Sequence, residues 1–381
     1  MYRISSAFTK KTFGAVSALV STAFVLSSAT SAQAVARDGD QDSLQSRHPN
    51  AICSQMQVPV SVPGAKDGHM YGELCTPRHP GAHSRTVNVL VPGASYDHSY
   101  FDFPVKSDTY SYVTQALNSG YSTFAVDRLG TGRSSIPPSD LDTVQNQTEA
   151  VHQVITHLTA GGAGHRTLGT ADRHPFSKVV WVGHSLGSEM AWYEAQKHHD
   201  VDAFVLTGLR HVPAQGSGDS GSEPPEGFMR ASDDARLKHR TTDPGYWTTA
   251  PGMRQIGFYY QPNAEQAVID RDESLKDLTN KWELGESATI GLPAAQSPSR
   301  AVTVPTLLAF GDQDVSYGCA ATSRTPCTPS AIEKLEKPFY PKADLDVLIA
   351  PDNGHDIQLH KNAPQTDNEI LNWIKSAAPS H

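Results

Sequence analysis

The chain has 381 residues, 38% of them hydrophobic, and its 40 acidic and 31 basic side chains give a formal charge of −9. This length suffices for one large α/β domain with an inserted segment. The acidic balance argues against nucleic acid and anionic lipid headgroups as main partners, because both are themselves negatively charged.

The amino-terminal stretch has the pattern of an export signal, and we expect residues 1–34 to be a signal peptide. The basic start includes Arg3, an apolar stretch covers residues 13–26, and Ala-Gln-Ala at 32–34 fits a small-residue cleavage site. The apolar stretch is short for a membrane span, and no second one follows it. We therefore predict a secreted, extracellular protein with no stable membrane anchor; an uncleaved anchor is the alternative.

The first two cysteines are placed symmetrically in an expected β-hairpin. Residues 58–62 and 69–74 have the composition of two strands joined by a turn around Gly64. Cys53 and Cys75 are equally distant from that glycine, so they would face each other across the hairpin. An even number of cysteines in an exported chain favours disulfides, which predicts a Cys53–Cys75 bond.

The remaining two cysteines, Cys319 and Cys327, would then close a short loop rich in Thr, Ser and Pro. Four free thiols are the alternative to these two disulfides. Zinc is not expected, because no Cys-x-x-Cys or histidine pairing accompanies the cysteines. The prediction is therefore no metal and no cofactor.

Beyond the hairpin, short apolar runs alternate with helical patterns. Strands are expected at 87–91, 122–126, 179–182, 203–206, 306–310 and 347–350. Helices are expected at 110–117, 148–158, 188–198 and 369–377. Strands that alternate with helices indicate a parallel sheet. The predicted fold class is α/β, with a mostly parallel central sheet and helices on both of its faces.

The region 209–300 departs from this alternation, within a domain expected to cover residues 35–381. It opens with a stretch rich in Gly, Ser and Pro at 215–225, which is typical of a connector. Aromatic residues such as Tyr246 and Phe258 follow. Because ligands bind outside the carboxyl ends of parallel strands, we expect a cap or lid over that edge. A structural excursion with its own small core is the alternative.

The most specific motif is Gly-His-Ser-Leu-Gly at 183–187, directly after the apolar run at 179–182. Its two glycines permit a sharp strand-to-helix turn in which larger side chains would clash. The turn exposes the hydroxyl of Ser185 at the edge of the sheet, which makes this residue the candidate nucleophile. The neighbouring His184 is expected to pack beneath the turn.

A serine hydroxyl becomes a nucleophile when a base takes its proton and a carboxylate holds that base. Two aspartates, Asp312 and Asp314, directly follow the penultimate expected strand. His355 follows the last expected strand in the sequence Asn-Gly-His, and His360 is its nearest rival. Both strands are expected to end at the same edge of the sheet as the strand before Ser185.

This order of elbow serine, strand-end aspartate and late Gly-His pair resembles the α/β-hydrolase superfamily, in its exported esterase- and lipase-like branch. The resemblance covers residues 87–375. In that family the catalytic acid usually lies three residues after the glycine that ends its strand, which implies Asp314 rather than Asp312. The Gly-His pair likewise implies His355 as the base, so the resemblance implies a triad with Ser185.

The tetrahedral intermediate of acyl transfer carries an oxyanion that needs two backbone N–H donors. The donors expected by position are Leu186, directly after the nucleophile, and Ala94, in the loop after the strand 87–91. Many relatives carry His-Gly in that loop, whereas this chain has Pro-Gly at 92–93. The aromatic residues at 96–101 would either line the substrate pocket or be buried under a surface loop.

Residues 127–134 resemble the D-x-x-G-x-G-x-S turn of the same superfamily. The turn lacks the lysine of a P-loop and the third glycine of a dinucleotide-binding motif. A structural role is therefore expected, in which two glycines permit a tight turn and Asp127 and Arg133 hold it.

The predicted function is a secreted serine hydrolase that cleaves small or lipid-like carboxylic esters through an acyl-enzyme. Peptidase, lactonase, thioesterase and acyltransferase or cyclase activities would use the same triad and are alternatives. An aminopeptidase would need acidic groups in the cap to hold a substrate amine, and those present include Glu265, Asp270, Asp272 and Glu273. A non-catalytic binding protein with the hydrolase shape is an alternative of another class.

Overall fold

The computed structural model describes residues 38–160, 176–212, 224–286, 289–319 and 326–379. The expected signal peptide and much of the expected connector at 215–225 lie outside these ranges. Among the described helices, none combines the length and the apolar character needed to cross a membrane.

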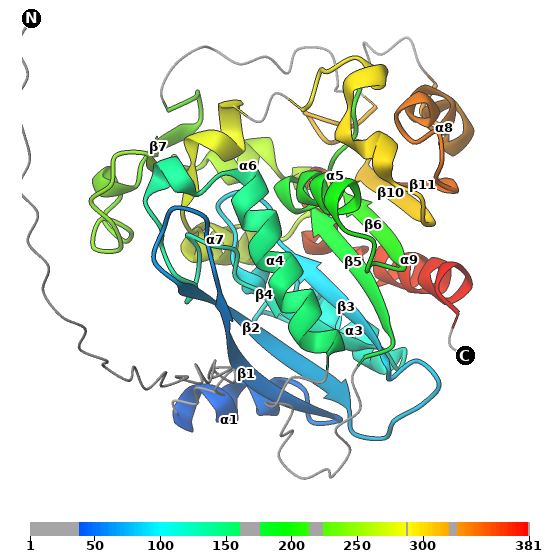
Figure 1. Ribbon diagram of the computed structural model, residues 1–381, viewed down its shortest axis with the longest axis horizontal. Coiled ribbons are helices and arrows are strands. Elements are labelled where there is room, and N and C mark those ends of the chain that lie inside the picture. Colours follow the sequence, from blue (N-terminus) through cyan, green and yellow to red (C-terminus); the bar gives the residue numbers. More distant parts are fainter. Residues whose placement is uncertain (1–37, 161–175, 213–223, 287–288, 320–325, 380–381) are drawn as a thin grey trace, which may run out of the picture. The chain divides into compact units, whose positions relative to one another are not determined.

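An eight-stranded sheet forms the centre of the domain, in the order β1-β2-β4-β3-β5-β6-β10-β11 (Figure 1). Its strands are β1 (Ala51–Val60), β2 (Gly68–Pro77), β3 (Thr86–Val91), β4 (Ser122–Val126), β5 (Lys178–His184), β6 (Ala203–Thr207), β10 (Thr306–Gly311) and β11 (Leu345–Ala350). Strand β2 runs antiparallel to both of its neighbours, β1 and β4, and all pairings from β4 to β11 are parallel. The α/β fold with a mostly parallel sheet is therefore confirmed.

The first two strands form the expected hairpin at one edge of the sheet. Cys53 of β1 stands opposite Cys75 of β2 in the register, and the two form a disulfide. A second disulfide joins Cys319 to Cys327, shortly after β10. Both strands are longer than the sequence pattern indicated, because pairing also stabilises the polar positions on either side of the apolar runs.

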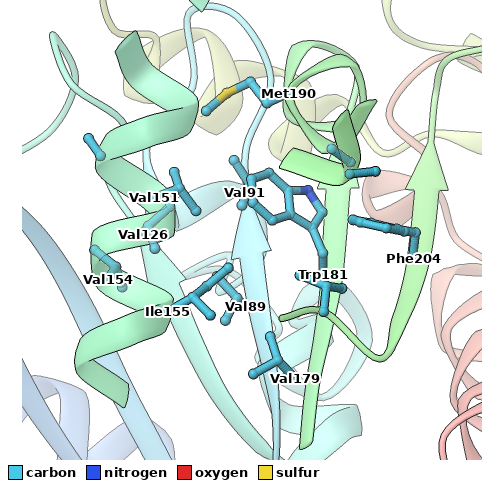
Figure 2. Packing of buried hydrophobic residues seen from close by; sticks show 14 of the residues in the cluster. Val89, Val91, Val126, Val151, Val154, Ile155, Val179, Trp181, Met190 and Phe204 are labelled. Carbon is cyan, nitrogen blue, oxygen red and sulfur yellow. The ribbon is translucent and has the colours of Figure 1, made fainter. Parts of the chain in front are cut away.

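Side chains of the central strands alternate between two buried clusters, one on each face of the sheet. In β5, Val179 and Trp181 belong to one cluster, whereas Val180 and Val182 belong to the other. Figure 2 shows the indole of Trp181 among apolar side chains from β3, α4 and α5. Because both faces are covered, these strands are nearly continuous apolar runs, which explains why they were recognisable in the sequence.

Helices cover both faces of the sheet. On one face lie α4 (Val144–Thr159) and α5 (Leu186–Lys197), and on the other lie α3 (Tyr112–Asn118) and α9 (Ala363–Ala377). Outside the segment between β6 and β10, the structure also has α1 (Asp38–Arg47), α2 (Ser107–Tyr110) and α8 (Pro329–Glu336). Helix α4 begins four residues before the expected position, because the hydroxyl of Thr143 accepts a hydrogen bond from the N–H of Asn146 and caps the helix.

A separate set of elements lies between β6 and β10. A three-stranded antiparallel sheet contains β7 (Phe228–Arg230), β8 (Tyr246–Thr249) and β9 (Thr279–Asn280), and two helices accompany it, α6 (Met253–Gly257) and α7 (Gln266–Leu275). A small apolar cluster supports this segment; its members are Ala231, Leu237, Tyr246 and Leu278. The segment also contacts the loops that follow β3 and β11, as described below.

Candidate active site

Ser185 occupies a sharp turn between β5 and α5 and has a strained backbone conformation, with φ 51° and ψ −115°. A Cβ at Gly187 would lie 2.0 Å from the carbonyl oxygen of Val91, and a Cβ at Gly183 would lie 2.4 Å from that of Gly187. Only glycine fits at both positions. The chain around the turn is buried, whereas Ser185 itself is partly exposed.

An imidazole and a carboxylate are paired at the same edge of the sheet. His355, after β11, has its Nδ1 2.8 Å from Oδ2 of Asp314, after β10. The other carboxylate oxygen of Asp314 accepts the backbone N–H groups of Ser316 and Tyr317, at 2.8 and 3.2 Å. Because these contacts fix the carboxylate, Asp314 can hold the His355 ring with its Nε2 free for proton transfer.

The end of β6 brings this pair close to the serine turn. The N–H of Ser185 donates to the carbonyl of Thr207 at 2.8 Å. A Cβ at the next residue, Gly208, would lie 2.9 Å from the ring of His184 and 3.3 Å from that of His355. The centroids of those two imidazoles are 4.8 Å apart. The loops that follow β5, β6 and β11 therefore meet at one place.

The two rival residues have other contacts. Asp312 accepts the backbone N–H of Asn353 at 3.3 Å and thereby ties the loop after β10 to the loop after β11. His360 is fully buried, and its Nε2 accepts the N–H groups of Gly354 and Tyr260 at 3.1 and 3.0 Å. His360 therefore supports the loop that carries His355 and has no direct access to a substrate.

Electrostatics distinguish the two histidines of the site. Burial acts to lower the pKa of His355, but the adjacent Asp314 carboxylate outweighs it and raises the pKa above the ordinary value. Burial and the neighbouring His355 hold the pKa of His184 well below its ordinary value. The ring of His184 stacks on that of Tyr100, with centroids 4.2 Å apart, and its Nε2 lies 3.1 Å from Oδ1 of Asp356, so this histidine is held by the core.

The two expected oxyanion donors belong to the residue after Ser185 and to the loop after β3. Leu186 is the first residue of α5, so its N–H has no acceptor within the helix. Ala94 lies in a turn in which the N–H of Tyr96 donates to the carbonyl of Gly93 at 3.2 Å. A Cβ at Gly93 would be only 3.1 Å from the Cβ of Ser185, so this turn directly contacts the serine.

Two buried arginines, neither apparent from the sequence, hold the turn that contains Ala94. Arg128 donates to the carbonyl of Gly93 at 2.9 Å and to Glu283 at 2.8 Å. Arg254, from α6, donates to the carbonyl and to the hydroxyl of Ser95 at 2.5 and 3.0 Å. Because the arginines reach consecutive parts of one turn, they restrict where its N–H groups can point.

A further buried network connects the segment between β6 and β10 to the histidine loop. The hydroxyl of Tyr96 lies 2.6 Å from Asp356 and 3.1 Å from Asp272, and Asp272 is paired with Arg254 at 2.8 Å. Burial raises the pKa of both carboxyls above their usual range. The aromatic residues of the loop after β3 are buried, so the alternative in which they line an open pocket is not what the structure has.

Residues 127–134 form a tight turn held mainly through Asp127. Its carboxylate accepts the N–H groups of His98 and Arg133 at 2.9 and 2.7 Å, and a Cβ at Gly132 would lie 1.9 Å from it. The Arg133 side chain donates to Gln55 and to the hydroxyl of Tyr71, both at 3.1 Å, and so ties the turn to β1 and β2.

Two aromatic rings lie close to His355. The rings of Phe258 and Tyr317 have centroids 5.5 and 6.0 Å from its imidazole, and both residues are half-buried. Near them in the sequence are the large apolar side chains Ile256 and Val315, which are 67% and 59% exposed. The surroundings of the base are therefore suited to an apolar group.

The sequence profile described as the Alpha/beta hydrolase family matches residues 89–365. An esterase from Thermogutta terrifontis is 16% identical, with a TM-score of 0.51 over 84% of this chain and 98% of its own. A monoacylglycerol lipase from Paleococcus ferrophilus is 17% identical, with a TM-score of 0.51 over 81% and 99%.

A peroxisomal alpha-beta-hydrolase from Saccharomyces cerevisiae is 11% identical, with a TM-score of 0.53 over 87% of this chain and 92% of its own. At these identities the likeness shows a shared fold. No curated protein matches the sequence significantly. Because the family profile spans most of the described domain, the chain belongs to the alpha/beta hydrolase family.

Proposed function

We propose that this protein is a secreted serine hydrolase of carboxylic esters, with Ser185 as nucleophile, His355 as base and Asp314 as the carboxylate that orients the base. The observation that carries the proposal is the 2.8 Å contact between His355 Nδ1 and Asp314, at the sheet edge where Ser185 has its strained turn. Serine hydrolases need all three groups in these roles.

In the proposed reaction, His355 takes the proton of the Ser185 hydroxyl as its oxygen attacks the ester carbonyl. The N–H groups of Leu186 and Ala94 hold the oxyanion that forms. His355 then gives the proton to the leaving alcohol, and an acyl-enzyme remains on Ser185. A water molecule, activated by the same imidazole, attacks the acyl group and releases the acid.

We propose that the substrate carries an apolar group and that region 209–300 acts as the cap. Phe258 of this region and Tyr317 both lie against His355, and Arg254 of the same region holds Ser95. Two of the proteins that share the fold are named as an esterase and a monoacylglycerol lipase. The apolar surroundings of the base are the structural support for this choice.

Export remains part of the proposal, with residues 1–34 as the signal peptide. The two disulfides, Cys53–Cys75 and Cys319–Cys327, support it, because disulfides persist in oxidising compartments outside the cytosol.

The direct test is the hydrolysis of p-nitrophenyl esters of increasing acyl length by wild type, Ser185→Ala and Ser84→Ala. Ser84 lies just before β3, at the amino-terminal end of that strand, whereas Ser185 follows the carboxyl-terminal end of β5. Ser84 therefore serves as the matched control. We expect wild type and the control to turn over the esters and Ser185→Ala to lose activity. Equal rates in wild type and Ser185→Ala would refute the proposal. A fluorophosphonate probe that labels wild type but not Ser185→Ala would show that the hydroxyl is activated.

A further inference from the structure

Two helices on one face of the sheet bring two imidazoles and a carboxylate together, far from the proposed active site. His152 belongs to α4, Glu194 to the last turns of α5, and His198 follows the end of α5. One nitrogen or carboxylate oxygen from each of the three lies within 4.8 Å of the others. The two rings stack with centroids 3.4 Å apart and an interplanar angle of 7°. We call these three residues the α4–α5 cluster.

Three carboxylates, those of Glu149, Glu194 and Asp200, lie around one lysine and the two imidazoles. Nδ1 of His152 faces two carboxylates at once, Oε1 of Glu194 at 3.1 Å and Oδ2 of Asp200 at 3.2 Å. Glu149 contacts Nε2 of His198 at 2.9 Å and has its own lysine partner, Lys197, at 2.7 Å. One ring nitrogen is therefore shared by two carboxyl groups that have no lysine or arginine partner of their own among the described residues.

Glu194 provides a second, independent observation. Its side chain is 1% exposed, and its carboxyl group lies against that of Asp200 as well as against His152. Oε2 of Glu194 and Oδ1 of Asp200 are both buried, and neither accepts a bond from an N–H group or from a Ser, Thr or Tyr hydroxyl among the described residues. Two adjacent buried carboxylates repel each other, so they must share a proton or a cation. A bound metal ion would take the place of that proton.

We infer that the α4–α5 cluster binds a divalent transition metal, with Zn²⁺ as the best fit, through His152, Glu194 and His198. Imidazole nitrogens and a carboxylate oxygen are donors that zinc prefers in proteins. Asp200 is the protein group next in reach for a fourth position.

The dimensions of the cluster suit such an ion. Neighbouring donors of a tetrahedral zinc ion lie about 3.4 Å apart when its bonds are about 2.1 Å long. The His152–Glu194 contact of 3.1 Å is already close to this separation. The two histidines are 23% and 17% exposed, so they are free to adjust and the ion can enter from solvent.

The bound metal would join α4 to the end of α5 and so stabilise the helix that begins at the nucleophile. The cluster lies at the opposite end of α5 from Ser185, about 16 Å along the helix axis at 1.5 Å per residue. The inference is therefore independent of the proposed ester hydrolysis and assigns the metal no part in that reaction.

The test is isothermal titration of the metal-stripped protein with ZnCl₂, together with thermal unfolding with and without the ion. The variants are His152→Ala, His198→Ala and Glu194→Gln. The matched control is His199→Ala, which removes an exposed histidine next to the cluster. We expect one zinc ion per chain and a rise in Tm for wild type and control. Each ligand variant should bind at least tenfold more weakly and lose the rise in Tm.

Equal zinc affinity in wild type, His152→Ala and His198→Ala would overturn the inference, as would the absence of binding by wild type. Glu194 is buried, so its variant could fail to fold. The two histidine variants change partly exposed side chains and decide the question in that case. Ester turnover measured on the same samples keeps the two proposals apart, because loss of zinc binding with turnover retained bears on the cluster alone.

Discussion

Arg254 donates hydrogen bonds to Ser95, 159 positions earlier in the chain, at 2.5 Å to the carbonyl and 3.0 Å to the hydroxyl. Another nitrogen of the same guanidinium contacts Asp272 at 2.8 Å, and the guanidinium carbon lies 4.0 Å from the ring centroid of Tyr96. The segment between β6 and β10 therefore holds the turn that carries Ala94. Substrate recognition and oxyanion binding would be coupled through this one side chain.

Replacing Arg254 by Ala should lower both kcat and stability. The turn at Ser95 loses two hydrogen bonds, so the Ala94 N–H is less well positioned for the oxyanion. Asp272 is left as a buried carboxylate without its partner, which should reduce the free energy of unfolding by about 3–5 kcal/mol. Steady-state kinetics and urea unfolding measure the two effects.

Two further variants separate the effects. Arg236→Ala removes an exposed arginine of the same segment and should change neither quantity. Adding Asp272→Asn to Arg254→Ala removes the unpaired charge, so stability should recover in part while kcat stays low. If kcat in Arg254→Ala matches wild type under folded conditions, the arginine has only a structural role.

The choice between the two aspartates after β10 can be tested directly. Asp314→Asn should lower kcat by roughly 10⁴-fold, because the amide no longer holds the reactive tautomer of His355. Asp312→Asn is the matched control, and a loss of less than about tenfold is expected, since the Asp312 carboxylate accepts the backbone N–H of Asn353 and an amide oxygen can do the same. Circular dichroism should show both variants folded. A reversed order of the two losses would show that Asp314 is not the catalytic acid.

The pH dependence of kcat/KM should report the ionisation of His355. Only the neutral imidazole can take the serine proton, so activity should rise with pH. The Asp314 carboxylate raises the pKa of His355 above its ordinary value, which places the midpoint of that rise above pH 6.5. In Asp314→Asn the midpoint of the residual activity should move to lower pH, because the charged ring loses its partner.

The measurement uses p-nitrophenyl ester hydrolysis at the isosbestic wavelength of p-nitrophenol, with Asp312→Asn as control. A midpoint that does not differ between wild type and Asp314→Asn would contradict the assignment of the two residues as a pair.

Gly187→Ala should abolish activity and strongly destabilise the domain. The added Cβ would lie 2.0 Å from the Val91 carbonyl, in a place where only backbone movement of β3 or α5 could make room. Gly81→Ala is the control, because a Cβ there meets nothing within 4 Å and Gly81 has no positive φ. Thermal unfolding of both variants measures the difference, and equal Tm values would show that the turn tolerates a side chain.

The sequence predicted the central sheet because its signals are local. Strands such as β4 and β10 are covered on both faces, so they are continuous apolar runs between turn residues. The elbow around Ser185 and the hairpin of Cys53 and Cys75 depend on neighbours close in the chain, and both were identified by spacing alone. That Asp314 and His355 lie at the same edge follows from the parallel sheet, whereas their choice over Asp312 and His360 rested on the resemblance to the α/β-hydrolase superfamily.

Contacts between distant segments carry no comparable local signal. No local pattern indicates that Arg128 and Arg254 are buried, and the folded chain places both side chains in the core. The prediction of no metal considered the spacing around the cysteines, whereas His152 meets Glu194 and His198 only because α4 packs against α5. The chain alone thus determined which elements form and where the sharp turn at Ser185 lies, since these depend on local backbone preferences and apolar periodicity. Tertiary packing decided which charged groups meet, because the free energy of burying a charge depends on partners far away in the sequence.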